Sequence, residues 1–121
     1  MRFYELAYLK AAPEVAGLQV VVRLDDFIIP SPDLVPDSVR AKIKRWSDYV
    51  DFWAVDWNFG AAGAGDTFHN EWQTYRTRGA SSLQLLSDPH VYPSAGAYRI
   101  LVKVIDIFGN DTTQLHEVEV A

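Results

Sequence analysis

Side chains that could catalyse a reaction or bind a metal are few in this chain of 121 residues, and their spacing matches no familiar site. The three histidines, His69, His90 and His116, are far apart and lack the i, i+4 pair of a zinc-binding helix. His69 and Glu71 would share one face of a strand, but a metal site needs further ligands. The chain has no cysteine, which excludes disulfides, thiolate metal sites and a cysteine nucleophile.

Three acids, Asp48, Asp51 and Asp56, suggest acid–base catalysis or a calcium site at first sight. The chain has no D-x-D-x-D-G loop, however, and Asp56 has apolar neighbours on both sides, so on a strand it should point away from the core. We therefore interpret these acids as solvated residues of turns and strand edges. Asp106 instead continues the buried phase of an alternating strand, and we expect it to accept backbone hydrogen bonds at the following turn.

Nucleophilic catalysis and phosphate binding are also unsupported. Ser81 and Ser82 have no neighbouring base motif. Residues 60–65 read G-A-A-G-A-G, but the Lys-Ser/Thr pair of a phosphate loop does not follow, so a plain loop is predicted. We expect no catalytic residue, no cofactor and no metal, and hence no enzyme activity in this domain itself.

One set of side chains does suit binding to nucleic acid or to a partner protein. Residues 69–78 combine aromatic rings that can stack on bases with arginines that can contact phosphates. A second basic group lies in residues 40–45, on a predicted helix. The candidate surface comprises Arg40, Lys44, Arg45, Trp72, Tyr75, Arg76 and Arg78. The alternative is that the two aromatic residues belong to the core and that the arginines are only solvated.

A mostly β domain is expected to position these residues. The chain is 49% hydrophobic and 22% charged, which is typical of a globular protein, and its length fits a single domain over residues 1–121. Its net charge of −5 argues against a free-standing nucleic-acid binder. Alternating apolar residues and turn signals predict about seven strands, over residues 3–10, 18–29, 52–59, 68–76, 83–86, 98–104 and 112–120.

A single short helix is predicted between the early strands, from Pro36 to about Trp46. Val39, Ile43, Trp46 and Val50 recur at helical spacing on one face, and the first three should be buried. A cluster of prolines ends the strand before this helix. We expect the helix to lie across an open edge or end of two packed sheets.

The closing half of the chain resembles a PKD domain. Residues 90–98 contain an H-x-Y and a G-x-Y, residues 106–110 read D-x-x-G-N, and residues 55–60 look like the W-x-F-G segment of that family. The resemblance covers residues 53–120 and implies an antiparallel Ig-like, PKD-like β-sandwich. It departs from the family in a longer Ala/Gly loop and in an insert over residues 67–86. Tyr98 resembles a tyrosine corner, in which the hydroxyl group bonds back to the backbone.

A second resemblance concerns the whole chain. Residues 43–49, 68–73 and 106–111 look like the tail region of some bacterial site-specific adenine DNA methyltransferases. The N/D-P-P-Y/F loop of such enzymes and a Gly-rich cofactor loop are absent here, so the resemblance implies only an accessory role in a restriction-modification enzyme.

Two functional hypotheses follow. In the first, the chain is the C-terminal domain of a cytoplasmic adenine-specific methyltransferase, docks on the parent's catalytic domain or a partner subunit, and contacts DNA weakly. In the second, it is a PKD-like carbohydrate- or protein-binding module of a secreted multidomain enzyme. No stretch approaches the roughly 18 apolar residues of a membrane span, so no membrane partner is expected.

Overall fold

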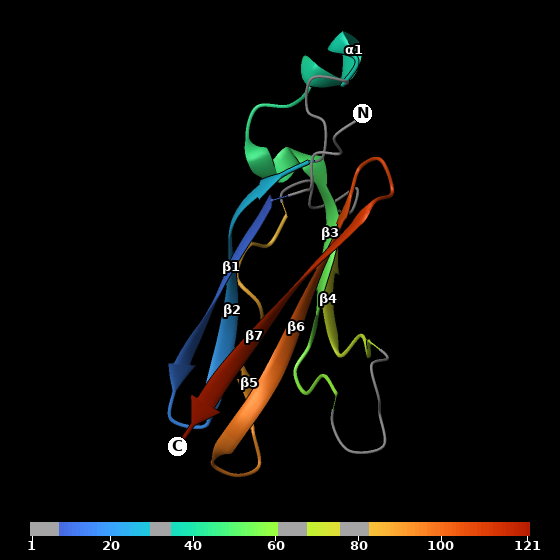
Figure 1. The fold of residues 1–121 in the computed structure, drawn as a ribbon. Helices are drawn as coiled ribbons and strands as arrows, with labels where there is room; N and C mark the ends of the chain where they lie inside the picture. The colour runs from blue at the N-terminus through green and yellow to red at the C-terminus, as the bar shows by residue number, and fades with distance from the viewer. Residues whose placement is uncertain (1–7, 30–34, 61–67, 76–82) are drawn as a thin grey trace.

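Two antiparallel sheets pack face to face in the computed structural model, which describes residues 8–29, 35–60, 68–75 and 83–121 (Figure 1). One sheet has the order β1-β2-β5 and the other has the order β4-β3-β6-β7. The strands are β1 (Tyr8–Ala16), β2 (Gln19–Ile28), β3 (Val50–Asp56), β4 (Trp72–Tyr75), β5 (His90–Val91), β6 (Gly96–Asp106) and β7 (Asp111–Val120). The expected mostly β, Ig-like sandwich is confirmed.

Strict alternation along the long strands produces the core. In β6, Ile100, Val102 and Val104 are fully buried, while the residues between them face outward. The facing residues of β2, Val20 and Val22, are equally inaccessible. Because successive side chains on a strand point to opposite faces, this pattern could be read from the sequence without knowing which strands pair.

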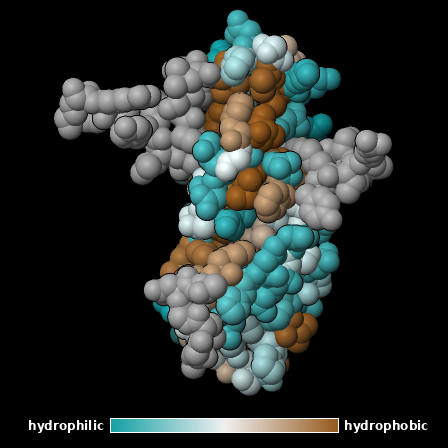
Figure 2. All heavy atoms as spheres, turned by 90° about the vertical axis from the view of Figure 1, so that its right-hand side faces the viewer, coloured by the Kyte–Doolittle hydropathy of each residue, from teal (hydrophilic) through white to brown (hydrophobic). Residues whose placement is uncertain are grey.

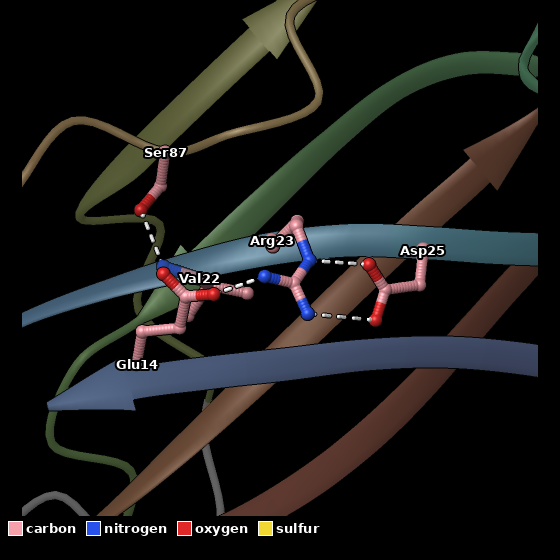
Figure 3. Close-up of polar contacts among 5 residues, drawn as sticks. All are labelled: Glu14, Val22, Arg23, Asp25 and Ser87. Carbon is pink, nitrogen blue, oxygen red and sulfur yellow. Dashed lines mark hydrogen bonds and ion pairs between the residues drawn. The ribbon is translucent and has the colours of Figure 1, made fainter.

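The segment predicted as a strand at residues 83–86 is not a regular strand. It runs along β2 and forms an isolated bridge from Leu86 to Arg23. Two backbone hydrogen bonds hold it there, from Leu24 to Leu85 and from Ser87 to Val22. The Val22 N–H, however, donates to the Ser87 hydroxyl at 2.8 Å (Figure 3). The Ser87 side chain therefore takes the place of a backbone acceptor for Val22, and the ladder of backbone hydrogen bonds between β2 and this segment is interrupted.

The predicted helix is much shorter than expected. Helix α1 (Asp37–Arg40) has four residues and none of them is buried. The chain then restarts as a 3₁₀-helix, η2 (Trp46–Tyr49), because Arg45 is extended and the Asp48 carboxylate accepts the N–H groups of Lys44 and Arg45. That bonding replaces the continuous helical ladder.

The location predicted for the helix at an end of the sandwich is nevertheless correct, since α1 lies beyond the ends of the strands in Figure 1. Val39, Ile43 and Trp46, which were predicted to be buried, are only half-buried. Val39 and Trp46 still pack against the core. The contact with the sheets is therefore made by two short turns and not by one helical face.

A side-chain amide joins the two sheets at the seam between β1 and β7. The Ala11 N–H donates to Gln114 Oε1, and Gln114 Nε2 donates to the Leu9 carbonyl, each at 3.1 Å. His116 Nε2 lies 2.9 Å from the same Gln114 oxygen. Gln114 thus occupies backbone groups on the edge strand β1 that could otherwise pair with another chain.

Candidate functional site

The basic run, defined here as Arg40, Lys42, Lys44 and Arg45, lies at the end of the sandwich that carries α1. All four residues are exposed. Asp48 fixes the second half of the run, because its Oδ2 accepts the Lys44 N–H at 2.9 Å and the Arg45 N–H at 3.3 Å. Three of the predicted surface residues, Arg40, Lys44 and Arg45, are therefore brought together on one end of the molecule.

Two basic side chains of the strands, Arg23 and Lys103, are engaged by acids of the same sheet. Arg23 pairs with Glu14 and with Asp25, whose Oδ1 lies 2.5 Å from the guanidinium Nε (Figure 3). The hydrogen bond to Asp25 and the charge of that carboxylate raise the pKa of Arg23, and the same contact lowers the pKa of Asp25. Lys103 lies 3.8 Å from Asp111.

The basic run differs from those cations, because Lys42 and Lys44 make no ion pair with any residue that the structure describes. Residues 35–49 contain four cations and two acids and so carry a net charge of +2. Since the whole chain carries −5, the other residues together carry −7. This segment is therefore positive within an acidic domain, with exposed Asp51 and Asp111 toward the same end.

The aromatic residues of the predicted surface, Trp72 and Tyr75, lie on β4 and not in the segment of the basic run. Trp72 is half-buried and packs edge-on against Trp53, with ring centroids 4.9 Å apart, so the alternative of a core role holds for it. Tyr75 is the last residue of β4 and pairs with Phe52 near the start of β3. Arg76 and Arg78 lie outside the described residues, so their part of the surface stays a prediction.

Asp56 was expected to be a solvated acid, and that expectation is wrong. Its side chain is only 2% exposed. The Oδ1 atom accepts the Asn58 N–H at 3.1 Å and the Oδ2 atom accepts the His69 N–H at 2.8 Å. Asp56 does lie on the outer face of its sheet, but the chain entering β4 covers that face. A local signal existed, because Asp often bonds the backbone N–H two residues later.

Glu71 extends this contact and forms a carboxylate pair with Asp56. Its Oε1 accepts the Trp57 N–H at 3.1 Å. Burial raises the pKa of Glu71 first, and the neighbouring Asp56 raises it further. Both carboxylates are thus committed to backbone donors, and no three His, Asp or Glu side chains converge to hold a metal in the described part of the chain. We read this pair as a structural clamp on the chain after β3.

A continuous stack of rings explains the H-x-Y and G-x-Y residues of the closing half. Trp57 stacks on His90 at 4.9 Å, His90 meets Tyr92 edge-on at 4.6 Å, and Tyr92 stacks on Tyr98 at 3.9 Å. The Tyr92 hydroxyl donates to the Trp57 carbonyl, and burial raises its pKa. The Tyr98 hydroxyl donates to the Ser94 carbonyl at 2.9 Å, as predicted for a tyrosine corner. These residues serve the fold.

The D-x-x-G-N turn is held by Asp106, as predicted. Its Oδ1 accepts the N–H groups of Phe108 at 2.9 Å and Asn110 at 3.1 Å. Gly109 has a φ of 85°, in the left-handed region where a side chain is strained. The turn therefore needs Asp106 and Gly109. Ile107 and Phe108 are exposed at its tip.

Comparison with known proteins supports the fold and no more. No family model matches the chain, and no curated protein matches it. The PKD1 domain of Vibrio anguillarum Epp is similar, with a TM-score of 0.53, 14% identity, and coverage of 98% of this chain and 96% of that one. The PKD1 domain of the Vibrio cholerae metalloprotease PrtV gives a TM-score of 0.49 and 16% identity over 93% of both chains.

The chain thus has a PKD-like, Ig-like β-sandwich fold. The predicted resemblance to the tail of adenine DNA methyltransferases finds no support in these comparisons. Among the described residues, no helix is long and apolar enough to cross a bilayer.

Proposed function

We propose that this PKD-like domain is a non-catalytic interaction module that docks through its basic run onto an anionic surface. The observation that carries the proposal is the position of the run. Exposed Lys42, Lys44 and Arg45 lie together in residues 35–49, which carry a net charge of +2, whereas the rest of the chain carries −7. Such an asymmetry orients the domain, because an anionic surface attracts this end and repels the others.

Distance keeps the acids at the far end of the sandwich from cancelling the attraction. Strand β6 has eleven residues and therefore spans about 36 Å. The Debye length at physiological salt is only about 8 Å. Acids toward the far end of the sandwich are therefore screened from a surface that touches the basic run.

The arrangement of aromatic residues favours this proposal over carbohydrate binding. Sugar-binding platforms use several exposed rings on one face, whereas Trp53, Trp57 and Tyr92 are buried and the exposed rings of Tyr8 and Phe108 belong to different sheets. Trp46 and Trp72 are half-buried and pack against the core. We therefore favour a PKD-like module that docks on an anionic surface, with the chain acting as one domain of a larger protein, over the carbohydrate-binding and methyltransferase forms.

Polyanion binding at low salt tests the proposal. Duplex DNA and poly-glutamate serve as probes, with fluorescence anisotropy as the measurement. We expect duplex DNA to bind no tighter than about 10⁻⁴ to 10⁻⁶ M at physiological salt. Lys42→Gln with Lys44→Gln should reduce the dependence of log K on log salt by about two units.

A matched control carries the same change in net charge at exposed positions of the opposite end, Gln19→Glu with Ala95→Glu. We expect this control to bind nearly as well as the wild type. Arg76→Ala with Arg78→Ala should flatten the salt slope by about one to two units if these arginines share the surface. Absence of salt-dependent binding to either probe, or equal losses in the lysine variant and the control, would overturn the proposal.

A further inference from the structure

Exposed apolar side chains gather at the same end of the sandwich as the basic run. Of the eight exposed large hydrophobic residues in the described part of the chain, four are at this end. Tyr8 and Ile28 pair at the ends of β1 and β2, and Ile107 and Phe108 form the tip of the β6–β7 turn. The other four are spread over the rest of the domain. Ile107 and Phe108 are adjacent at the tip of one turn, and adjacent exposed apolar side chains are typical of a contact surface.

Figure 2 shows the side on which β3, β4 and the β6–β7 turn lie in Figure 1. Apolar atoms form a band in the upper half of this side, toward the end that carries α1, and hydrophilic side chains flank the band (Figure 2). The lower half of the described surface is mostly hydrophilic (Figure 2). The apolar and the basic features therefore belong to the same half of the molecule.

A direct hydrogen bond links the apolar turn to the basic run. The Ile107 N–H donates to the Tyr49 carbonyl at 2.9 Å. Tyr49 ends η2, and Arg45 is the residue that caps the start of η2. Since a 3₁₀-helix rises about 2 Å per residue, Arg45 lies only about 8 Å along the chain from the residue that Ile107 contacts. Both are anchored, Arg45 by Asp48 and the turn by Asp106.

We propose that this end of the domain, comprising the basic run together with Ile107 and Phe108, binds the surface of an anionic lipid bilayer. This inference rests on the function proposed above and specifies its partner. The lysines and arginines contact headgroup phosphates, and the two apolar side chains at the tip of a convex turn enter the interfacial region. A nucleic acid would use the cations but would leave Ile107 and Phe108 in water. The expectation of no membrane partner rested only on the lack of a spanning segment, which such a contact does not need.

Local acids limit the strength of this contact. Asp51 at the start of β3 and Asp111 at the start of β7 are exposed toward the same end. Asp111 is partly neutralised by Lys103, 3.8 Å away. Binding should therefore be reversible, should require anionic lipid, and should weaken as salt rises.

Co-sedimentation of the full chain with vesicles tests the inference. The vesicles are made of phosphatidylcholine alone or with phosphatidylglycerol. We expect partitioning only into the vesicles that contain phosphatidylglycerol. Lys42→Gln with Lys44→Gln should lower the partition coefficient by about thirtyfold, from a contribution of about 1 kcal/mol per cation. Phe108→Ser should lower it by about fivefold, since roughly half of the ring is already buried in the free domain.

Leu115→Ser is the matched control for Phe108→Ser, because both side chains are 45% exposed but Leu115 lies in the middle of β7. Near-UV circular dichroism verifies that each variant is folded. Equal partitioning of wild type and Phe108→Ser, or equal losses in Phe108→Ser and Leu115→Ser, would overturn the lipid inference. Binding to DNA or poly-glutamate without binding to vesicles would also overturn it while leaving the proposed function intact. Failure to bind any of these probes would refute both.

Discussion

The buried Asp56 carboxylate makes a sharp prediction about stability. Replacing Asp56 with Ala removes the acceptor for two backbone N–H groups, those of Asn58 and His69. Hydrogen bonds to a charged group contribute about 1.5 to 3 kcal/mol each, and both of these bonds are partly buried. We therefore expect Asp56→Ala to lower the free energy of unfolding by about 4 kcal/mol, a large part of the roughly 5 to 15 kcal/mol of a typical domain.

Two further variants separate the hydrogen bonds from the charge. Asp56→Asn keeps one acceptor but turns an amide NH₂ toward the second donor, so we expect a loss of about 2 kcal/mol. Glu71→Gln keeps the acceptor for the Trp57 N–H and removes the repulsion between the two carboxylates. At neutral pH, Glu71→Gln should therefore be neutral or slightly stabilising.

The sign of the pH dependence follows from the raised pKa of Glu71. Between its unfolded value of 4.5 and its higher folded value, the folded state binds more protons than the unfolded state. Stability contributed by this group is thus present at low pH and is lost as pH rises through that window. Glu71→Gln should remove this component of the pH profile.

Urea denaturation followed by tryptophan fluorescence measures these effects, with Asp111→Ala as the exposed control. Hydrogen exchange at the Asn58 and His69 amides provides a second readout, and Asp56→Ala should accelerate both. A loss below about 1 kcal/mol for Asp56→Ala, with both amides still protected, would show that the clamp is not formed.

Three other predictions concern separate contacts. Tyr98→Phe removes the hydroxyl bond to the Ser94 carbonyl and should cost about 1 kcal/mol at an unchanged m-value; an unchanged midpoint would count against the tyrosine corner. Gln114→Ala opens the seam between β1 and β7 and should cost about 2 kcal/mol in urea denaturation, whereas Gln73→Ala on an exposed position should cost little. Burial lowers the pKa of His116, so near pH 6.5 and below the unfolded state binds more protons than the folded state, and stability should fall as the pH drops through that region. His116→Gln should flatten this part of the stability–pH profile. An unaltered profile would contradict the reasoning.

The long strands and the closing turn could be predicted from the sequence because their signals are local. Alternation over residues 98–104 assigns each side chain to a face before any partner strand is known, and β6 follows it. Asp106 and Tyr98 were predicted correctly because each bonds the backbone only four residues away or fewer. Such contacts form wherever the chain takes up the turn.

The candidate site was predictable only in part. The basic residues could be grouped from their spacing, although the helix expected to carry them ends at Arg40. The sequence pattern could not predict whether Trp72 shares a surface with these cations, because a half-buried Trp can belong either to the core or to the surface. Its contact with Trp53 on the neighbouring strand decided for the core.

The sequence by itself determined the β-sandwich class and the two faces of each long strand, because a period of two is a property of the extended backbone. Only the tertiary structure decided what covers each face. Asp56 points outward, as its neighbours predict, yet it is buried because residues 68–71, distant in the chain, pack over it. The placement of Ile107 beside the segment that follows the basic run likewise depends on a hydrogen bond across more than fifty residues. Local periodicity cannot encode such contacts, since they depend on which strands pair and in which register.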